Sequence, residues 1–266
     1  MISNISGSQR VTFETKCYEK DWQSLICKGQ IEKMIDHCNY EFEKRVLYIN
    51  NVSDYKKVKK AADKLVGRKI IDRYVIVKEL ADFALETLGI DGNSFNGGYY
   101  YSIAELVSIY LCTTDYLLHF SGDSLIEKIN KDWISSAISL FEKENRIIVA
   151  NPLWDNKYDE AKRESFEEDD NWWYSYGFSD QCYLIKAKMF QSKIYNESNK
   201  LSNRYPAYGG ELFEKRVDSY LRNHNYVRIT NKQVSYFHQN IKINQNHRNY
   251  NRLMTFCKQK VEHLFK

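Results

Sequence analysis

Asp123 is the residue whose type and position most directly indicate chemistry. It comes soon after the apolar segment YLLHF, which is typical of a buried strand. The chain has neither a Gly-x-Gly-x-x-Gly sequence after its first predicted strand nor a Walker-type Gly-Lys-Ser/Thr, which argues against a dehydrogenase and a P-loop NTPase. If this strand end binds a nucleotide, the negative charge of its diphosphate must be neutralised in another way. The simplest way is a divalent cation, Mn²⁺ or Mg²⁺, that Asp123 holds.

Four apolar segments separated by helical patterns would position this acid. The predicted strands are VTFETKC, RVLYIN, RYVIV and YLLHF. Helices are expected between them over residues 21–37, 54–65, 80–88 and 102–112. The first helix is interrupted at Gly29, and the last begins with a Ser102–Glu105 capping box. This alternation predicts an α/β fold with a mostly parallel central sheet flanked by helices.

The carboxyl ends of parallel strands meet at one edge of a sheet, where ligands bind at a switch in strand order. The segments expected at this edge are 15–19, 50–54, 78–79 and 121–123. A second half is expected to follow, with a helix over 133–143, a strand RIIVANP, a polar and aromatic loop over 155–176, a strand CYLIK, a helix over 210–224 and strands YVRIT and QVSYFH.

The composition indicates a globular chain and excludes several classes of protein. Its 266 residues are 43% hydrophobic and 28% charged, with 2 Pro, which does not suit a disordered or collagenous chain. No apolar run approaches the ~20 residues that span a bilayer, and MISNISGSQR lacks the apolar core of a signal peptide, so we expect a cytoplasmic protein. Six scattered cysteines without a Cys-x-x-Cys pair argue against a zinc ribbon or a disulfide framework. The net charge of +4 does not require a nucleic-acid partner.

The order of these segments resembles the nucleotide-sugar glycosyltransferases of the GT-A fold, particularly the family 2 type, over about residues 10–239. In those enzymes a strand ends in Asp-x-Asp, and the last acid binds the metal. Here the motif is Ser121, Gly122 and Asp123, so a hydroxyl replaces the first acid. The segment LYINNVSDYKKV resembles the family's strand followed by Asp-Asp-x-Ser-x-Asp, with amides in place of the first two acids.

The resemblance also implies roles for individual residues. The segment YGFSDQCYLIK is similar to the acceptor-side segment that carries the catalytic base, which maps to Asp180, and QVSYFH places His238 where many GT-A enzymes have a metal-binding histidine. The implied nucleotide-binding residues are Thr15, Tyr18, Glu19, Asn50, Asn51, Lys78, Ser121 and Gly122. The expected acceptor-binding residues are Trp172, Trp173, Tyr208, Gly209, Gly210 and Glu211.

Each role has a structural alternative. Asp123 also suits a helix or turn cap, and Asp180 a turn between Ser179 and the next strand. A lone histidine at a strand end, such as His238, is often a satisfied structural residue. Acids at the start of a helix, such as Glu211, also favour the helix dipole.

The activity implied by the resemblance is inverting, metal-dependent transfer of a sugar from a nucleoside diphosphate sugar to an acceptor hydroxyl. A UDP-sugar is favoured over a GDP-sugar because asparagine offers both a donor and an acceptor to a uracil-like edge. The expected acceptor is a glycan or lipid-linked glycan of surface glycan synthesis. Two alternatives stay open. One is a nucleotidyltransferase, although the segment FETKCYEKDW lacks the Gly-rich signature of those enzymes, and the other is an inactive glycan- or protein-binding module.

The predicted organisation is one catalytic domain over residues 1–240 and a helical extension over 241–266 packed on it. In this extension Leu253, Cys257, Val261 and Leu264 share one helical stripe.

Overall fold

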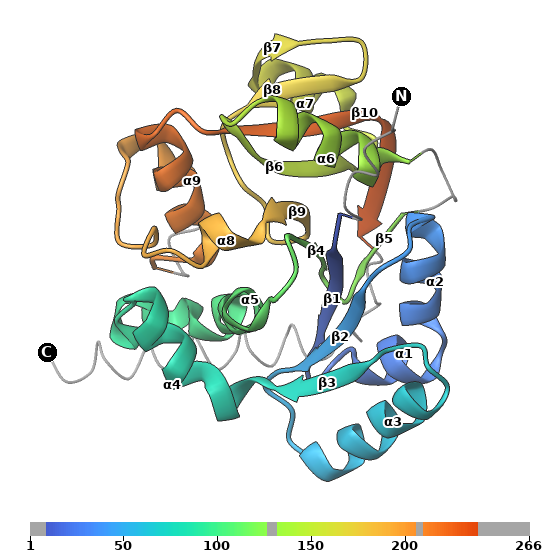
Figure 1. Cartoon of the computed structure of the whole chain (residues 1–266). Helices are drawn as coiled ribbons and strands as arrows, with labels where there is room; N and C mark the ends of the chain where they lie inside the picture. The colour runs from blue at the N-terminus through green and yellow to red at the C-terminus, as the bar shows by residue number, and fades with distance from the viewer. Residues whose placement is uncertain (1–8, 127–131, 206–209, 239–266) are drawn as a thin grey trace, which may run out of the picture.

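The core of the protein is one mixed sheet, which the computed structural model describes over residues 9–126, 132–205 and 210–238 (Figure 1). Its strands are β1 (Val11–Cys17), β2 (Lys44–Ile49), β3 (Arg73–Ile76), β4 (Tyr116–Phe120), β5 (Ser124–Ile126), β6 (Ile147–Trp154), β7 (Ser165–Glu168), β8 (Trp172–Ser175), β9 (Cys182–Lys186) and β10 (Val227–His238). Their order is β3-β2-β1-β4-β9-β6-β10-β8-β7, and β5 pairs with β10.

The first four predicted strands form the parallel part of this sheet. β1 lies between β2 and β4, and β3 lies at the outer edge beside β2, all in parallel pairs. The register sets Glu14 of β1 opposite His119 of β4. This arrangement confirms the predicted α/β core and brings the carboxyl ends of β1, β2 and β4 to one edge.

The second half adds antiparallel pairs. β9 runs antiparallel to both β4 and β6, and β8 runs antiparallel to β10. The two predicted strands YVRIT and QVSYFH are one twelve-residue strand, β10. The pairing with β6 shifts register between Asn231 and Ser235, and the Asn231 side chain accepts hydrogen bonds from the backbone N–H groups of Gln233 and Val234. This irregularity explains why the sequence pattern indicates two strands.

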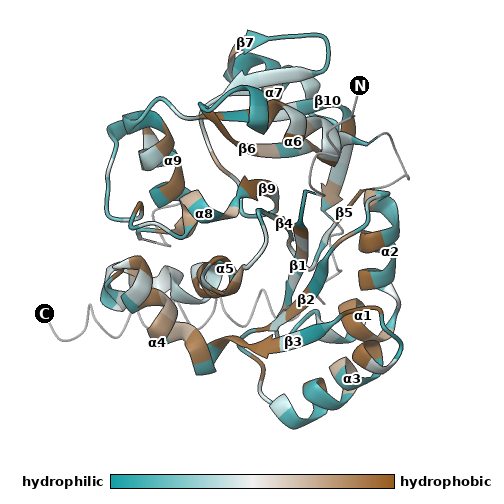
Figure 2. Ribbon diagram, in the orientation of Figure 1, coloured by the Kyte–Doolittle hydropathy of each residue, from teal (hydrophilic) through white to brown (hydrophobic). Residues whose placement is uncertain are grey.

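Helices cover both faces of the sheet. On one face lie α1 (Trp22–Cys27), α2 (Gln30–Cys38), α3 (Tyr55–Gly67) and α6 (Trp133–Lys143). On the other lie α4 (Val77–Leu88), α5 (Tyr99–Leu111), α8 (Ala187–Phe190) and α9 (Phe213–Asn223). Helix α7 (Tyr158–Glu164) and the 3₁₀ segments η1 (Gly92–Gly98) and η2 (Lys200–Arg204) complete the described elements. Figure 2 shows hydrophobic residues along the central strands and on α5, whose residues 102–109 are all buried.

Two local predictions are wrong. The Ser102–Glu105 capping box lies inside α5, which begins at Tyr99: the Ser102 hydroxyl accepts a hydrogen bond from the Phe213 N–H, and Glu105 pairs with Lys16. The predicted loop over 155–176 contains α7, β7 and β8. The predicted break at Gly29 is confirmed, because its φ of 73° separates α1 from α2.

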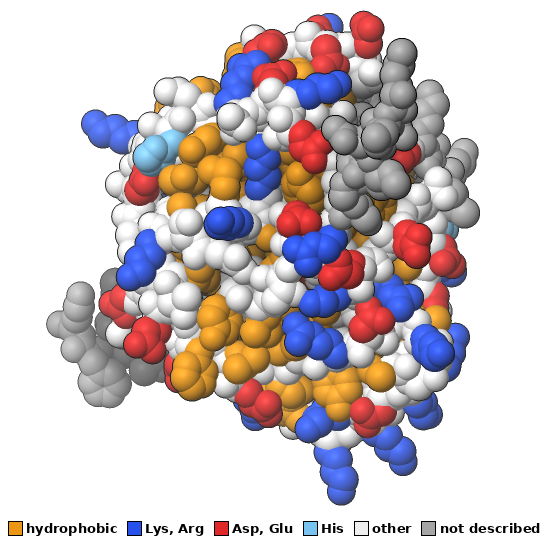
Figure 3. All heavy atoms as spheres, in the orientation of Figure 1, with side chains coloured by type: hydrophobic (Ala, Val, Ile, Leu, Met, Phe, Trp, Pro, Cys, Tyr) orange, Lys and Arg blue, Asp and Glu red, His pale blue; other side chains and the backbone are white. Residues whose placement is uncertain are grey.

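The surface carries charges of both signs. On the face shown in Figure 3, Lys and Arg side chains are interspersed with Asp and Glu. Within the described residues, no helix is both long enough and apolar enough to cross a membrane. The described cysteines, Cys17, Cys27, Cys38, Cys112 and Cys182, are free thiols. The predicted helical extension lies outside the described residues.

Candidate active site

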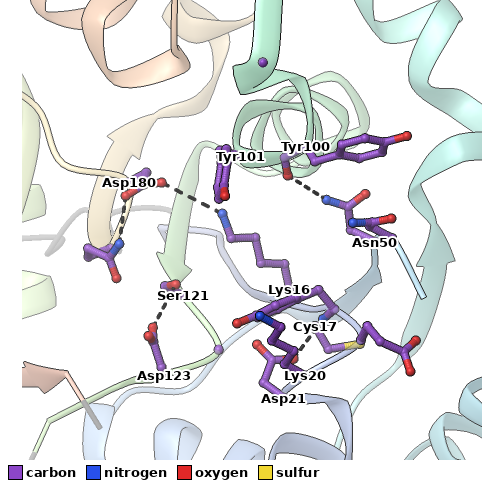
Figure 4. Close-up of a pocket in the computed structure, with 16 residues that line it drawn as sticks. Lys16, Cys17, Lys20, Asp21, Asn50, Tyr100, Tyr101, Ser121, Asp123 and Asp180 are labelled. Atoms are coloured by element: carbon purple, nitrogen blue, oxygen red, sulfur yellow. Dashed lines mark hydrogen bonds and ion pairs between the residues drawn. The ribbon is translucent and has the colours of Figure 1, made fainter. Parts of the chain in front are cut away.

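A cavity of about 490 Å³ lies at the carboxyl ends of β1, β2 and β4 (Figure 4). The start of α5 and the segment before β9 form its other walls. The predicted site residues among those that line it are Tyr18, Glu19, Asn50, Asn51, Ser121, Gly122, Asp123 and Asp180. The structure therefore brings together residues that are far apart in the sequence: Tyr18 and Asp180 are separated by 162 positions.

Gly122 lets the ends of β1 and β4 meet at the floor of this cavity. A Cβ atom on Gly122 would stand 2.8 Å from the carbonyl oxygen of Lys16 and 2.9 Å from Oδ2 of Asp21. The Gly122 carbonyl accepts a hydrogen bond of 2.6 Å from Nε2 of Gln30. The turn that presents Asp123 is thus packed against the end of β1, and a side chain at position 122 would push it away.

Two acids lie side by side at this junction. Asp21 is 4% exposed, and its carboxylate accepts a hydrogen bond of 2.8 Å from the N–H of Tyr18. Burial raises the pKa of Asp21 to about 7; the charge of Asp123 adds to the rise, and the Tyr18 N–H opposes it. Asp123 itself accepts a hydrogen bond of 3.1 Å from the hydroxyl of Ser121, the residue that replaces the first acid of the motif.

These acids fit a cation that is shared with a substrate. Among the described residues, no group of three or more His, Cys, Asp or Glu side chains lies close enough to hold a metal ion by itself. Mg²⁺ is commonly bound by one or two carboxylates, with substrate phosphates and water completing its shell. Asp123, with Asp21 beside it, supplies such oxygens.

His238 is not among the residues that line the cavity. Its Nε2 lies 2.6 Å from Oε1 of Gln181, and its Nδ1 lies 3.6 Å from Oδ2 of Asp155. Gln181 itself lines the cavity, so His238 supports the cavity wall from behind. The backbone of His238 pairs with Ser124, the residue after Asp123, and the metal-binding role of His238 stays a prediction.

Lys16 is a site residue that the sequence analysis did not single out. Its ammonium group forms an ion pair with Glu105 of α5, which is fully buried, and lies 4.0 Å from Oδ2 of Asp180. Deeper in the core, Glu14 accepts hydrogen bonds from Ser108 at 2.9 Å and contacts Nδ1 of His119 at 2.6 Å. The signal in the sequence was the pair Glu14 and Lys16, two charges on one face of a strand that is otherwise buried.

Asp180 lies on the cavity wall opposite the carboxyl ends of β1 and β2, and three side chains contact it. Its side chain is 14% exposed and accepts a hydrogen bond of 3.0 Å from Nε2 of Gln181. Glu214, in the first turn of α9, is hydrogen-bonded to Asp180. Burial and the charge of Asp180 raise the pKa of Glu214 well above its usual range, although Lys16 and Arg204 oppose the rise. Glu214 is therefore the proton donor of this carboxyl pair.

The raised pKa of Glu214 predicts a pH-dependent effect of Glu214→Gln. Folded Glu214 keeps its proton in a pH range in which the unfolded chain has lost it, so its contribution to the free energy of unfolding decreases as pH rises through that range. Glutamine has no proton to lose. The stability of Glu214→Gln relative to the wild type should therefore increase with pH, by at most about 1.4 kcal/mol per pH unit.

Urea unfolding from acidic to mildly alkaline pH measures this difference. The effect of Asp21 is common to both proteins and cancels. Glu86→Gln, at an exposed position of α4, is the matched control and should show no such trend. A difference between Glu214→Gln and the wild type that is independent of pH would contradict the protonated state of Glu214.

Tyr100 and Tyr101 are further cavity residues that the sequence analysis missed, because it began the helix at Ser102. They are 57% and 58% exposed and line the cavity. The Asn50 side chain donates a hydrogen bond of 3.0 Å to the carbonyl of Tyr100, which joins the end of β2 to the start of α5. Their rings are suited to contact a bound ligand at the mouth of the cavity.

Several predicted nucleotide-binding residues have other contacts. Thr15 is fully buried in β1 and does not line the cavity. The ammonium of Lys78 lies 3.9 Å from the ring centroid of Tyr55, also outside the cavity. Glu19 lines the cavity, but its carboxylate accepts two hydrogen bonds from Ser53, at 2.6 and 2.8 Å. The nucleotide roles of Thr15 and Lys78 are therefore not supported.

The structure does not support the acceptor-binding roles predicted for Trp172 and Trp173. Trp172 and Trp173 are buried in β8, at 2% and 5% exposure, because this segment pairs with β10 instead of forming a loop. Their rings are not available for stacking on a sugar. Glu211 forms a hydrogen bond of 2.6 Å with Lys215 and precedes α9 together with Gly210. Tyr208 and Gly209 lie outside the described residues.

Comparison with solved structures identifies the fold. The structure of GalNAc-T7 with UDP, GalNAc and Mn²⁺ is similar with a TM-score of 0.53 at 9% sequence identity, over 88% of this chain and 44% of that chain. Mouse xyloside xylosyltransferase 1 in its apo form gives 0.46 at 10% identity, over 82% and 84% of the two chains. The galactosyltransferase LgtC with donor and acceptor sugar analogs gives 0.42 at 15% identity, over 82% and 72%.

The chain thus has the GT-A fold predicted from its sequence, and it spans less than half the length of GalNAc-T7. No protein-family model matches the sequence, and no curated protein matches it significantly. The family 2 assignment therefore remains a prediction.

Proposed function

We propose that this chain is a glycosyltransferase that moves a sugar from a nucleoside diphosphate sugar to an acceptor hydroxyl. The observation that carries the proposal is the cavity at the strand ends of a GT-A fold, which has Asp123 at its floor and Asp180 on the opposite wall. A donor and an acceptor can meet between an acid suited to hold a metal and a second acid whose carboxylate can take a proton.

The nucleotide of the donor would lie across the ends of β1 and β2. Tyr18, Asn50 and Asn51 line this part of the cavity, and the amides favour a uracil-like base and hence a UDP-sugar. Asp123, with Asp21 beside it, would hold Mn²⁺ or Mg²⁺. When bound, the ion would neutralise charge on the diphosphate as it leaves.

Asp180 would act as the general base. Its carboxylate would take the proton of the acceptor hydroxyl as that oxygen attacks the anomeric carbon from the face opposite the diphosphate, which inverts the configuration. Gln181, Glu214 and Lys16 contact Asp180 from different elements and would hold its carboxylate in one orientation. A glycan or lipid-linked glycan is the acceptor class we propose.

Thermal unfolding with a panel of nucleotide sugars, with Mn²⁺ or with EDTA, tests the proposal. A ligand at ~100 times its Kd that binds only the folded state adds about 2.7 kcal/mol, which moves the Tm of a chain of this size by several degrees. We expect a UDP-sugar to raise the Tm with Mn²⁺, and Asp123→Asn to remove the Mn²⁺-dependent part. Asp132→Asn, at the start of α6 and outside the cavity, is the control.

Other outcomes would support the alternatives. Stabilisation by free glycans or a protein, without any response to nucleotide sugars, would identify a binding module. Stabilisation by nucleoside triphosphates in preference to nucleotide sugars would favour a nucleotidyltransferase. By contrast, slow, metal-dependent release of free sugar from the donor would support the proposed transferase against the binding module, because it is transfer of the sugar to water.

A further inference from the structure

A second cavity, of about 200 Å³, lies between the ends of α7 and η2 and the helix α9. It is lined by Glu164 at the end of α7, Tyr176 after β8, Arg204 at the end of η2 and Arg222 of α9. Arg228 of β10 lies behind it and contacts Glu164. No residue of this cavity has a role in the function proposed above.

The charges around this second cavity do not balance. Arg204 and Arg228 share Glu164, with nitrogen to oxygen distances of 3.1 and 3.2 Å. The Nε of Arg222 lies 3.0 Å from both oxygens of Asp218, which is fully buried. Glu214 is also near Arg204, but no ion pair joins the two among the described residues: Glu214 is hydrogen-bonded to Asp180, and burial and the charge of Asp180 raise its pKa. Three arginines therefore face two carboxylates, which leaves one positive charge for a ligand.

The arginines that line the cavity retain donors for such a ligand. Arg204 uses Nη1 for Glu164, and Arg222 uses Nε for Asp218. Their side chains are 39% and 17% exposed, whereas that of Arg228 is 5% exposed and has Ser175 as a further partner. Guanidinium groups donate paired hydrogen bonds that match the geometry of phosphate and carboxylate oxygens.

The second cavity lies close to Asp180. A Cβ atom on Gly177 would stand 2.3 Å from Nη2 of Arg204, so the backbone of Gly177 is packed directly against this arginine. The hydroxyl of Tyr205, next to Arg204, bonds both the N–H and the carbonyl of Phe178, at 2.8 and 2.7 Å. Gly177 is three residues before Asp180, a span of at most about 11 Å in extended chain.

We propose that this arginine pocket, formed by Arg204 and Arg222 with Tyr176 and Glu164, binds an oxyanion carried by the acceptor, a phosphate or a carboxylate group. The inference rests on the proposed function, because it places the reacting hydroxyl at Asp180. It narrows the acceptor to a molecule that carries its negative charge near the reacting hydroxyl, because the backbone from Gly177 to Asp180 spans at most about 11 Å. The donor diphosphate belongs in the other cavity, beside Asp123.

Titration of the full-length protein with inorganic phosphate, and separately with acetate, tests this pocket directly by calorimetry or NMR. The protein is first freed of cations with EDTA and then dialysed into chelator-free buffer, so that no cation holds the anion at Asp123. Arg204→Gln should weaken binding about tenfold, since it removes a charged hydrogen-bond donor. Glu164→Gln should tighten binding, because it removes a competing carboxylate and keeps an oxygen for Arg228. Arg146→Gln, which loses exposed pairs with Glu144 and Glu167 and a contact with the Tyr174 ring but does not line the pocket, should leave binding unchanged.

Arg204→Gln and Glu164→Gln are expected to change the anion affinity in opposite directions. This keeps the test decisive, because a damaged fold cannot tighten binding. Absence of phosphate and acetate binding, or equal effects of all three variants, would overturn the pocket. Donor hydrolysis by the wild type is measured in parallel. Hydrolysis without anion binding refutes this inference alone, whereas anion binding without donor binding or hydrolysis refutes the proposed function and with it the assignment to an acceptor.

Discussion

Asp180→Asn should lower kcat by about 10²- to 10⁴-fold, the range that general-base catalysis contributes. Asparagine keeps the shape of the side chain and an oxygen that can accept hydrogen bonds from Gln181 and from the protonated Glu214. It cannot take a proton from the acceptor. The loss should therefore fall on kcat, while the Kd of the donor measured by calorimetry stays within a few-fold of the wild-type value.

The matched control is Asp82→Asn, at an exposed position of α4, which should retain wild-type kcat. Two results would refute the role of Asp180. One is near-normal transfer by Asp180→Asn, and the other is a product that retains the anomeric configuration, because retention requires a different arrangement of groups at the anomeric carbon.

The parallel core could be predicted because its signals are local. β1, β2, β3 and β4 are short apolar segments between amphipathic helices, and burial on both faces favours such segments in parallel sheets. Asp54 begins α3 and accepts a hydrogen bond from the N–H of Lys57, as its residue type suggests. Because parallel strands end at a common edge, this much was enough to place Asp123 near Tyr18 and Asn50.

The contacts of the site could not be predicted because they join elements that are distant in sequence. Lys16 and Glu105 are 89 residues apart, and no sequence pattern states which helix covers the polar face of β1. The same ambiguity made Ser102 and Glu105 resemble a capping box, although both point toward tertiary partners. Trp172 and Trp173 follow an acidic segment, but pairing with β10 buries them.

Arginine clusters are equally hidden in the sequence. Arg204, Arg222 and Arg228 come from η2, α9 and β10. Arg204 and Arg222 stand next to polar residues that suggest a solvated surface, and Arg228 lies in the predicted strand YVRIT. Only the fold shows that Arg204 and Arg228 share Glu164 and approach Gly177, and that Arg222 lines the same cavity as Arg204. Their spacing in the sequence shows no helix or strand periodicity, because each arginine comes from a different element.

Lys16→Met should lower the free energy of unfolding by about 3–5 kcal/mol, the cost of leaving one partner of a buried ion pair uncompensated. Glu105 is fully buried in α5, and its Oε2 has no hydrogen-bond partner within the described part of the chain. The Lys16 ammonium is the positive charge that faces it. Methionine fills a similar volume, so the loss should come from the unpaired carboxylate rather than from a void.

A double-mutant cycle separates these causes. Lys16→Met with Glu105→Met replaces both charges by apolar groups, and the double variant should regain most of the stability lost by Lys16→Met alone, because replacing a whole buried pair is often neutral. Lys57→Met, at an exposed position of α3, controls for the general effect of the substitution. Urea unfolding measures the wild type, Lys16→Met, Glu105→Met, the double variant and the Lys57→Met control. Additive losses in the double variant would mean that the Lys16 and Glu105 side chains do not interact, and that Lys16 is held in the cavity by other groups.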